Sequence, residues 1–103
     1  MKKYTGNEIE KLKDQDVFSS NAEWTGLNVD AAELIYALVS VGVINNGNIG
    51  IKELARLFEK MFNLKLDDIY RKFQDIQGRT TVKTKFLDKL KAALLRRLND
   101  MDI

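Results

Sequence analysis

The segment DAAELIYALVSVGVI at residues 30–44 is apolar on almost every side, because only Glu33 and Ser40 interrupt it after Asp30. A helix of this composition must be covered on most sides. Its length of roughly 21 Å is too short to cross a bilayer. We therefore predict a central core helix, with Asp30 as its N-cap and Glu33 completing a capping-box pair. A buried strand is the alternative, because Val and Ile crowd the second half of the segment.

The composition around this segment limits the chemistry that the chain can perform. The chain has 103 residues, enough for one domain with a modest core, and it has neither Cys nor His. Disulfides and thiolate metal sites are thus excluded, and the commonest general base is missing. There is also no glycine-rich phosphate loop and no nucleophile motif. The sequence predicts a protein that is not an enzyme and holds no metal or cofactor.

The chain divides into a short N-terminal part and one helical domain. Residues 1–22 are predicted to be a tail or a short helix over about 6–13, and residues 23–103 a single domain. Residues 23–25 and 49–51 are candidates for two very short strands. The predicted fold class is all-α with at most two short strands. No apolar stretch follows the basic start, so a soluble cytoplasmic protein is expected.

Two amphipathic helices are predicted after the apolar segment, at residues 51–62 and 67–77. Apolar residues recur at three-four spacing in both. Asn63 is a suitable cap for the end of the first, and the acidic pair Asp67 and Asp68 suits the start of the second. The short connection makes this a helix-turn-helix in the loose sense.

The last predicted helix follows a polar connection over residues 79–84, which is either an extended wing or the lead-in to that helix. Thr84 is its predicted N-cap. Its apolar side chains are spaced to face the core. The predicted core comprises Trp24, Leu34, Ile35, Leu38, Phe58, Phe62, Tyr70, Phe73, Phe86, Leu90 and Leu94.

Charge is unevenly distributed along the chain, although the net charge is only +2. Residues 1–51 carry four Lys/Arg and seven Asp/Glu, whereas residues 52–103 carry thirteen and eight. The densest part, residues 79–97, has seven basic residues and one acidic residue. Such asymmetry indicates a polyanionic partner. A solvated helix face is the other interpretation of the same pattern.

Basic and hydroxyl side chains near the second amphipathic helix form the candidate DNA-binding set. Arg71 and Lys72 would enter the major groove, and the candidates within residues 79–85 would contact phosphates. The full set is Lys65, Arg71, Lys72, Arg79, Thr80, Thr81, Lys83, Thr84 and Lys85. A protein-interaction bundle is an equal alternative from these residues, in which Leu57 and Leu95 present spare apolar surface to a second copy or another protein.

Several short motifs in one order resemble the RteC family over roughly residues 23–98. They are WTG at 24–26, ELIYAL at 33–38, NG at 46–47, IKE at 51–53, FEK at 58–60, FN at 62–63, Arg79 and TKFLD at 84–88. The resemblance is to the C-terminal region of that family. It implies a Bacteroides transcriptional regulator that binds double-stranded DNA and controls excision of conjugative transposons. It also implies a winged helix, with residues 51–62 and 67–77 as its helix-turn-helix.

Overall fold

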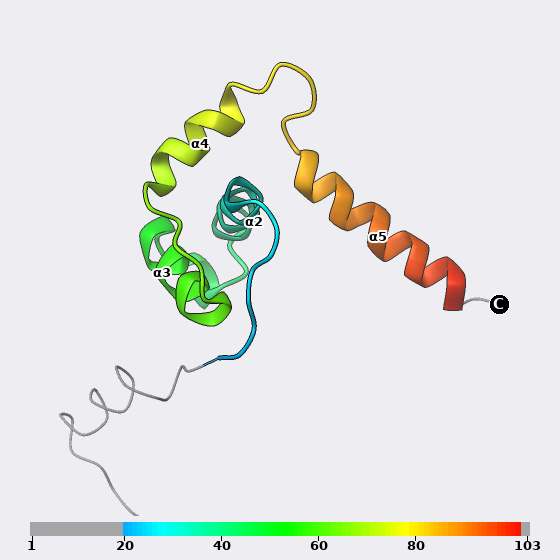
Figure 1. Cartoon of the computed structure of the whole chain (residues 1–103), viewed down its shortest axis with the longest axis horizontal. Coiled ribbons are helices and arrows are strands. Elements are labelled where there is room, and N and C mark those ends of the chain that lie inside the picture. The colour runs from blue at the N-terminus through cyan, green and yellow to red at the C-terminus, as the bar shows by residue number, and fades with distance from the viewer. Residues whose placement is uncertain (1–19, 102–103) are drawn as a thin grey trace, which may run out of the picture.

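The structure is a computed structural model that describes residues 20–101, with Met101 described by its backbone alone. It contains α2 (Asn28–Val41), the 3-10 turn η1 (Asn45–Gly47), α3 (Ile51–Phe62), α4 (Ile69–Gln77) and α5 (Lys85–Met101). No strand occurs over these residues, so the described part is all-α (Figure 1). The helix predicted over about 6–13 lies outside the described residues.

Helix α2 lies at the centre of the described residues, as the apolar segment predicts. It contacts α3, α4, α5 and η1, and the only other contact between these elements joins α3 to α4. Ala31, Ala32 and Ile35 of α2 are completely buried. The central core helix is therefore confirmed, and the alternative of a buried strand is wrong.

The C-terminal end of α2 comes earlier than the apolar pattern predicts. The helix stops at Val41 because Gly42 adopts a φ of 77°. In this left-handed conformation its N–H donates to two carbonyls of the preceding turn. A glycine inside an apolar run can thus end a helix that hydropathy alone would continue to Ile44. Val41 and Val43 are consequently exposed.

The start of α2 also differs from the prediction, and the predicted capping box is wrong. Leu27 is the N-cap residue, and no side chain accepts a hydrogen bond there. Asp30 instead lies within the first turn. Glu33 turns inward and is only 5% exposed, so its carboxylate is used elsewhere in the fold.

Helices α3 and α4 follow the predicted pattern, and their caps are confirmed. Asn63 adopts the left-handed conformation at the end of α3, with φ 50°. At the start of α4 the Asp68 carboxylate accepts hydrogen bonds from the N–H groups of Tyr70 and Arg71. Helix α4 begins two residues later than predicted, because Asp67 has a φ of 55° and precedes it.

The segment before α2 is tied to the end of α3, and the two short strands predicted at 23–25 and 49–51 are wrong. The Trp24 N–H donates to the Phe62 carbonyl at 2.8 Å. The Asn63 side-chain amide donates to two carbonyls of the segment before Trp24, at 2.7 and 2.9 Å. Strands of three residues make few ladder hydrogen bonds. The end of α3 supplies hydrogen-bond partners to the first segment instead, and Ile51 of the second segment is the first residue of α3.

The core lies between α2, α3 and α4, with Leu66 filling the turn between the last two. Its buried apolar residues are Ala31, Ala32, Ile35, Ile49, Leu54, Ala55, Phe58, Leu66 and Ile69. Among the predicted core residues, Ile35 and Phe58 are buried, and Trp24, Leu34, Leu38 and Phe62 pack at the edge. Tyr70 is 50% exposed, so its prediction as a core residue is wrong.

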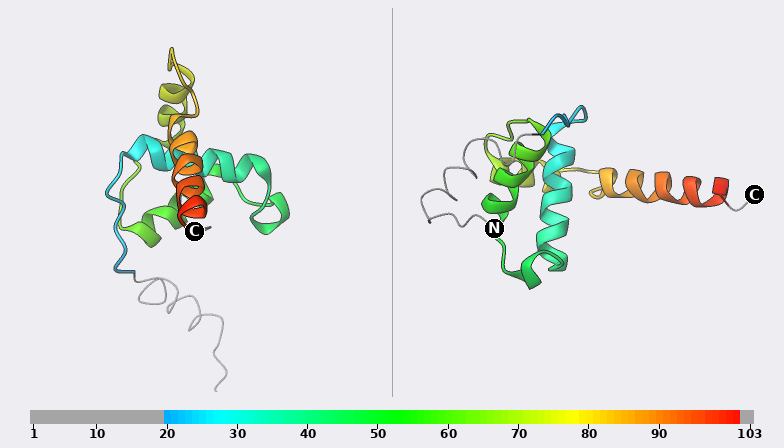
Figure 2. Two further views of the ribbon diagram at one scale, coloured as in Figure 1. Left: turned by 90° about the vertical axis from the view of Figure 1, so that its right-hand side faces the viewer. Right: turned by 90° about the horizontal axis from the view of Figure 1, so that it is seen from below.

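Helix α5 projects from the other helices instead of closing over them (Figures 1 and 2). Of the described helices it contacts α2 alone. Near its start the Phe86 ring packs edge-on against Trp24, with ring centroids 5.8 Å apart. The prediction that Leu90 and Leu94 belong to the core is therefore wrong, since both lie further along the projecting part and are exposed.

Candidate nucleic-acid interface

A buried carboxylate on α2 fixes the approach to the basic helix α5. Oε1 of Glu33 accepts a hydrogen bond from Nη1 of Arg79 at 2.5 Å, which also forms an ion pair. Oε2 accepts from the backbone N–H of Leu87 at 2.8 Å. The same Arg79 nitrogen donates to the Lys83 carbonyl at 2.7 Å. One carboxylate therefore fastens both the α4–α5 connection and the first turn of α5 to the core helix.

The N-terminus of α5 begins after Thr84, as predicted, but a different side chain caps it. The Thr84 hydroxyl donates to the Asp88 carboxylate at 3.1 Å. The backbone N–H of Leu87, which has no partner within the helix, donates to the carboxylate of Glu33, 54 positions earlier in the chain. A carboxylate is favourable here because the helix N-terminus carries partial positive charge. The cap of this helix is thus a tertiary contact.

The Lys83 ammonium caps the preceding helix. It donates to the Gln77 carbonyl and, at 3.2 Å, to the Arg79 carbonyl. Cations are favourable at a helix C-terminus, where carbonyl groups lack partners within the helix. Two of the candidate DNA-binding residues, Arg79 and Lys83, consequently hold the α4–α5 connection in place.

The other candidate residues differ in their exposure and in the charge of their sequence neighbours. Lys72 on α4 is half buried, and the exposed Arg71 beside it follows the acidic pair Asp67 and Asp68. The remaining exposed candidates are Lys65, Thr80, Thr81, Thr84 and Lys85. Only the last of these continues into a longer exposed basic surface.

That surface lies on α5, where sequence analysis named a single candidate. Five basic side chains of this helix are exposed: Lys85, Lys89, Lys91, Arg96 and Arg97. Helical spacing places Lys85, Lys89 and Arg96 along one side, which we name the basic stripe of α5. Leu90, Leu94 and Leu98 follow the spacing of a different side. The sequence indicates the basic stripe through the spacing of Lys85, Lys89 and Arg96, which is i, i+4 and i+11.

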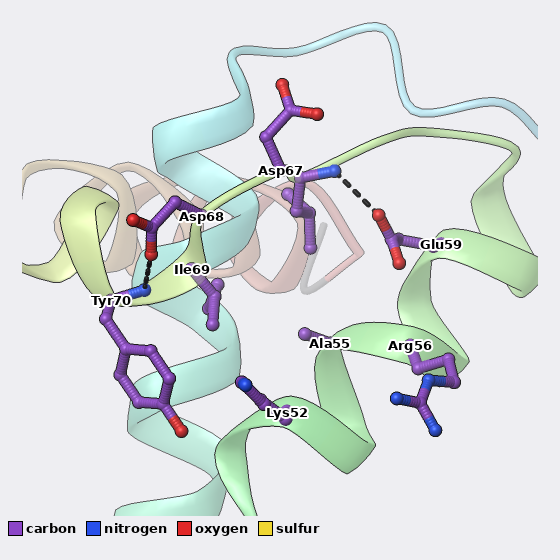
Figure 3. A pocket seen from close by; sticks show the side chains of 9 residues that line it. Lys52, Ala55, Arg56, Glu59, Asp67, Asp68, Ile69 and Tyr70 are labelled. Atoms are coloured by element: carbon purple, nitrogen blue, oxygen red, sulfur yellow. Dashed lines mark hydrogen bonds between the residues drawn. The ribbon is translucent and has the colours of Figure 1, made fainter.

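The hollow between α3 and α4 has mixed charge (Figure 3). Its volume is about 430 Å³, and its lining includes Lys52 and Arg56 together with Glu59, Asp67 and Asp68. The Lys52 ammonium lies 5.7 Å from the centroid of the Tyr70 ring, and the Glu59 carboxylate accepts from a backbone N–H of the turn. Because both cationic and anionic side chains line this hollow, its charge does not favour an anionic ligand. The described residues also hold no acidic cluster suited to a metal ion.

Helix α4 also packs on α2 through stacked aromatic rings. Tyr36 and Phe73 have ring centroids 4.2 Å apart and planes inclined by 23°. Burial raises the pKa of the Tyr36 hydroxyl, and Tyr70 and Asp68 raise it further. This stacking helps to hold α4, which carries Arg71, in position against α2.

The fold and its charges define a class of small all-α domains in which a projecting amphipathic helix carries a basic stripe. The family model described as RteC protein matches residues 1–102, so the chain belongs to the RteC family. This match extends the resemblance from residues 23–98 to nearly the whole chain. No curated protein and no solved structure matches it. Among the described residues, no helix is long and apolar enough to cross a membrane.

Proposed function

We propose that this chain is a DNA-binding domain of a transcriptional regulator, without enzymatic activity, that controls genes for conjugative-transposon excision. Membership of the RteC family supports this proposal. The observation that carries it is the basic stripe of α5, whose three side chains are exposed on a helix that projects from the core. Phosphate contacts supply most sequence-independent affinity for DNA. The proposed partner is double-stranded DNA, with no role for a membrane.

The structure allows a sharper choice of residues for testing phosphate contacts than the sequence did. Arg79 and Lys83 have internal partners, so their replacement would disturb the α4–α5 connection as well as any DNA contact. The residues of the basic stripe, Lys85, Lys89 and Arg96, have no such role in the described structure. The test should therefore use the basic stripe alone.

Changing Lys85, Lys89 and Arg96 together to Ala should weaken binding to every DNA sequence and flatten the salt dependence. Each phosphate contact contributes about 0.9 to the slope of log K against log salt, so loss of three should reduce it by about 2.7. Fluorescence anisotropy with a labelled duplex at rising salt measures this slope.

The matched control removes three exposed cations from another helix. Lys52, Arg56 and Lys60 are spaced by four residues on α3, and their replacement by Ala gives the same change in net charge. This control should leave the slope nearly unchanged. If it flattens the slope and the α5 variant does not, the phosphate contacts lie on α3 and the proposed surface is wrong.

Arg71→Ala tests whether α4 reads bases in the major groove. Its side chain is exposed on the first turn of α4, whereas its backbone N–H is held by Asp68. Loss of one bidentate base contact should cost about 1–3 kcal/mol at a single position of the preferred sequence. Selection of bound sequences from a random duplex pool measures this preference. An identical preferred sequence for Arg71→Ala and the unchanged chain would remove α4 from base recognition.

A protein-interaction module without direct DNA contact is the second candidate function. The exposed apolar side chains Leu57 on α3 and Leu95 on α5 favour it. Sedimentation with and without DNA separates the two functions. A complex with protein that forms equally in both conditions, with no shift of the DNA, supports this second function.

A further inference from the structure

A small hollow, which we name the α5 pocket, lies between the start of α2 and the first turns of α5. Its volume is about 290 Å³, and its apolar lining consists of Leu27, Val29 and Phe86. Leu27 is 65% exposed although it is apolar, and Val29 and Phe86 are half buried. Three apolar side chains from two separate parts of the chain therefore form a surface that is open to solvent.

Charged side chains complete the lining of the α5 pocket. Lys85 and Lys89 are exposed on one side of α5, and Asp30 is half buried in the first turn of α2. Arg79 also lines the pocket, but its guanidinium is paired with the Glu33 carboxylate. With that ion pair counted as neutral, two lysines and one aspartate leave the pocket with one positive charge in excess.

We infer that the α5 pocket binds a small organic monoanion, with its anionic group at Lys85 and Lys89 and its apolar body on Leu27 and Phe86. Ligand sites combine an apolar lining with a few polar groups that fix the orientation of the ligand. At about 30 Å³ for each non-hydrogen atom, the share of a water molecule in the liquid, the pocket holds about ten such atoms. A single ring or a short alkyl chain with one carboxylate has this size. The inference does not depend on DNA binding, and its tests contain no DNA.

The lining of the α5 pocket favours this ligand over an inorganic anion and over a neutral apolar molecule. Inorganic phosphate has no apolar body to cover Leu27, and Asp30 would repel its second negative charge. A neutral molecule would leave the excess positive charge of the pocket without a counterion. A monoanion with an apolar body uses both features of the lining.

Trp24, the only Trp in the chain, contacts both walls of the α5 pocket. Its ring packs edge-on against Phe86, with ring centroids 5.8 Å apart. Its Nε1 donates to the Leu27 carbonyl at 2.9 Å. A ligand bound between Leu27 and Phe86 should therefore change the fluorescence of Trp24, to which no other indole contributes.

Titration of the full chain with phenylacetate, followed by Trp24 fluorescence, tests the inference. We expect saturable binding with a dissociation constant in about the millimolar range, because a ligand of about ten non-hydrogen atoms gains little free energy. Phenylethanol has the same ring without the charge and should bind at least about threefold more weakly. Either no saturable change with phenylacetate or equal binding of phenylethanol overturns the inference.

Replacing Lys85 and Lys89 together by Ala should weaken phenylacetate binding at least about threefold. Both side chains are exposed, so the helix content measured by circular dichroism should not change. The matched control replaces Lys91 and Arg97 by Ala, which removes the same charge from other sides of the same helix. It should leave the dissociation constant unchanged. Equal weakening by both pairs would mean that binding responds to net charge alone, and the proposed site would be wrong.

Leu27→Ser tests the apolar part of the α5 pocket. Leu27 is the N-cap residue of α2 without a side-chain hydrogen bond, and Ser is favourable at that position, so the fold should remain. Binding of phenylacetate should weaken at least about twofold, because the ligand loses an apolar contact. Val43→Ser removes an apolar side chain of equal exposure, 66%, outside the pocket and should have no effect. A Leu27→Ser chain that binds phenylacetate as tightly as the unchanged chain would contradict the proposed position of the ligand.

Discussion

Replacement of Glu33 by Ala is expected to lower the free energy of unfolding by about 3–5 kcal/mol, the range for removing one partner of a buried ion pair. The Arg79 guanidinium, with a side chain only 17% exposed, would lose its carboxylate. The N–H of Leu87 would lose its acceptor at the start of α5. Chemical denaturation measures the global loss, and amide hydrogen exchange at Leu87 measures release of α5.

Two further variants make the Glu33 experiment specific. Glu33→Gln keeps the size of the side chain but can accept only one of the two hydrogen bonds well, so its loss should be about 1.5–3 kcal/mol. Glu53→Ala removes an exposed carboxylate from the first turn of α3, at an expected cost below about 1 kcal/mol. A loss for Glu33→Ala no larger than that for Glu53→Ala would show that the carboxylate does not hold α5.

The local features of this fold could be predicted from the sequence because they depend on neighbouring residues. The bounds of α3 follow from its apolar spacing, and Asn63 and Asp68 act as caps through their own backbone or the next turn. The end of α2 was predictable in principle, since Gly42 supplies a left-handed residue after the last apolar turn. The hydropathy pattern does not indicate this helix end, because apolar residues lie on both sides of Gly42.

The role of Glu33 could not be predicted, because its partners lie 46 and 54 positions away. Its spacing from Asp30 matches a local capping box equally well, and nothing local distinguishes the two arrangements. The same limit affects the candidate interface. Arg79 and Lys83 count as free cations in a linear pattern, whereas the fold pairs them with a carboxylate and with carbonyls.

The path of α5 is the largest difference between pattern and structure. An apolar helix face indicates that something covers it, without identifying what does. The apolar spacing of α5 predicts that the core covers Leu90 and Leu94, as in a closed bundle. The connection between α4 and α5 is held by Arg79 and Lys83 so that α5 leaves the bundle instead. Five exposed cations, Lys85, Lys89, Lys91, Arg96 and Arg97, therefore lie on a projecting helix.

Replacement of Ile35 by Ala should lower the free energy of unfolding by about 2–5 kcal/mol, the range for deleting a large buried aliphatic side chain. Ile35 is 0% exposed and lies on the helix that contacts α3, α4 and α5. The other helices cannot all move to fill the space, so most of the cavity should remain. Urea denaturation followed by circular dichroism measures this loss.

A graded series on α2 separates loss of packing from loss of helix propensity. Ile35→Val should cost about 0.5–1.5 kcal/mol, and Leu38→Ala should fall below Ile35→Ala because Leu38 is only partly buried. Val41→Ala, at an exposed position of the same helix, should change stability by less than about 0.5 kcal/mol. Equal losses at Ile35 and Val41 would mean that neither side chain is enclosed. The central place of α2, on which the positions of α4 and α5 depend, would then be wrong.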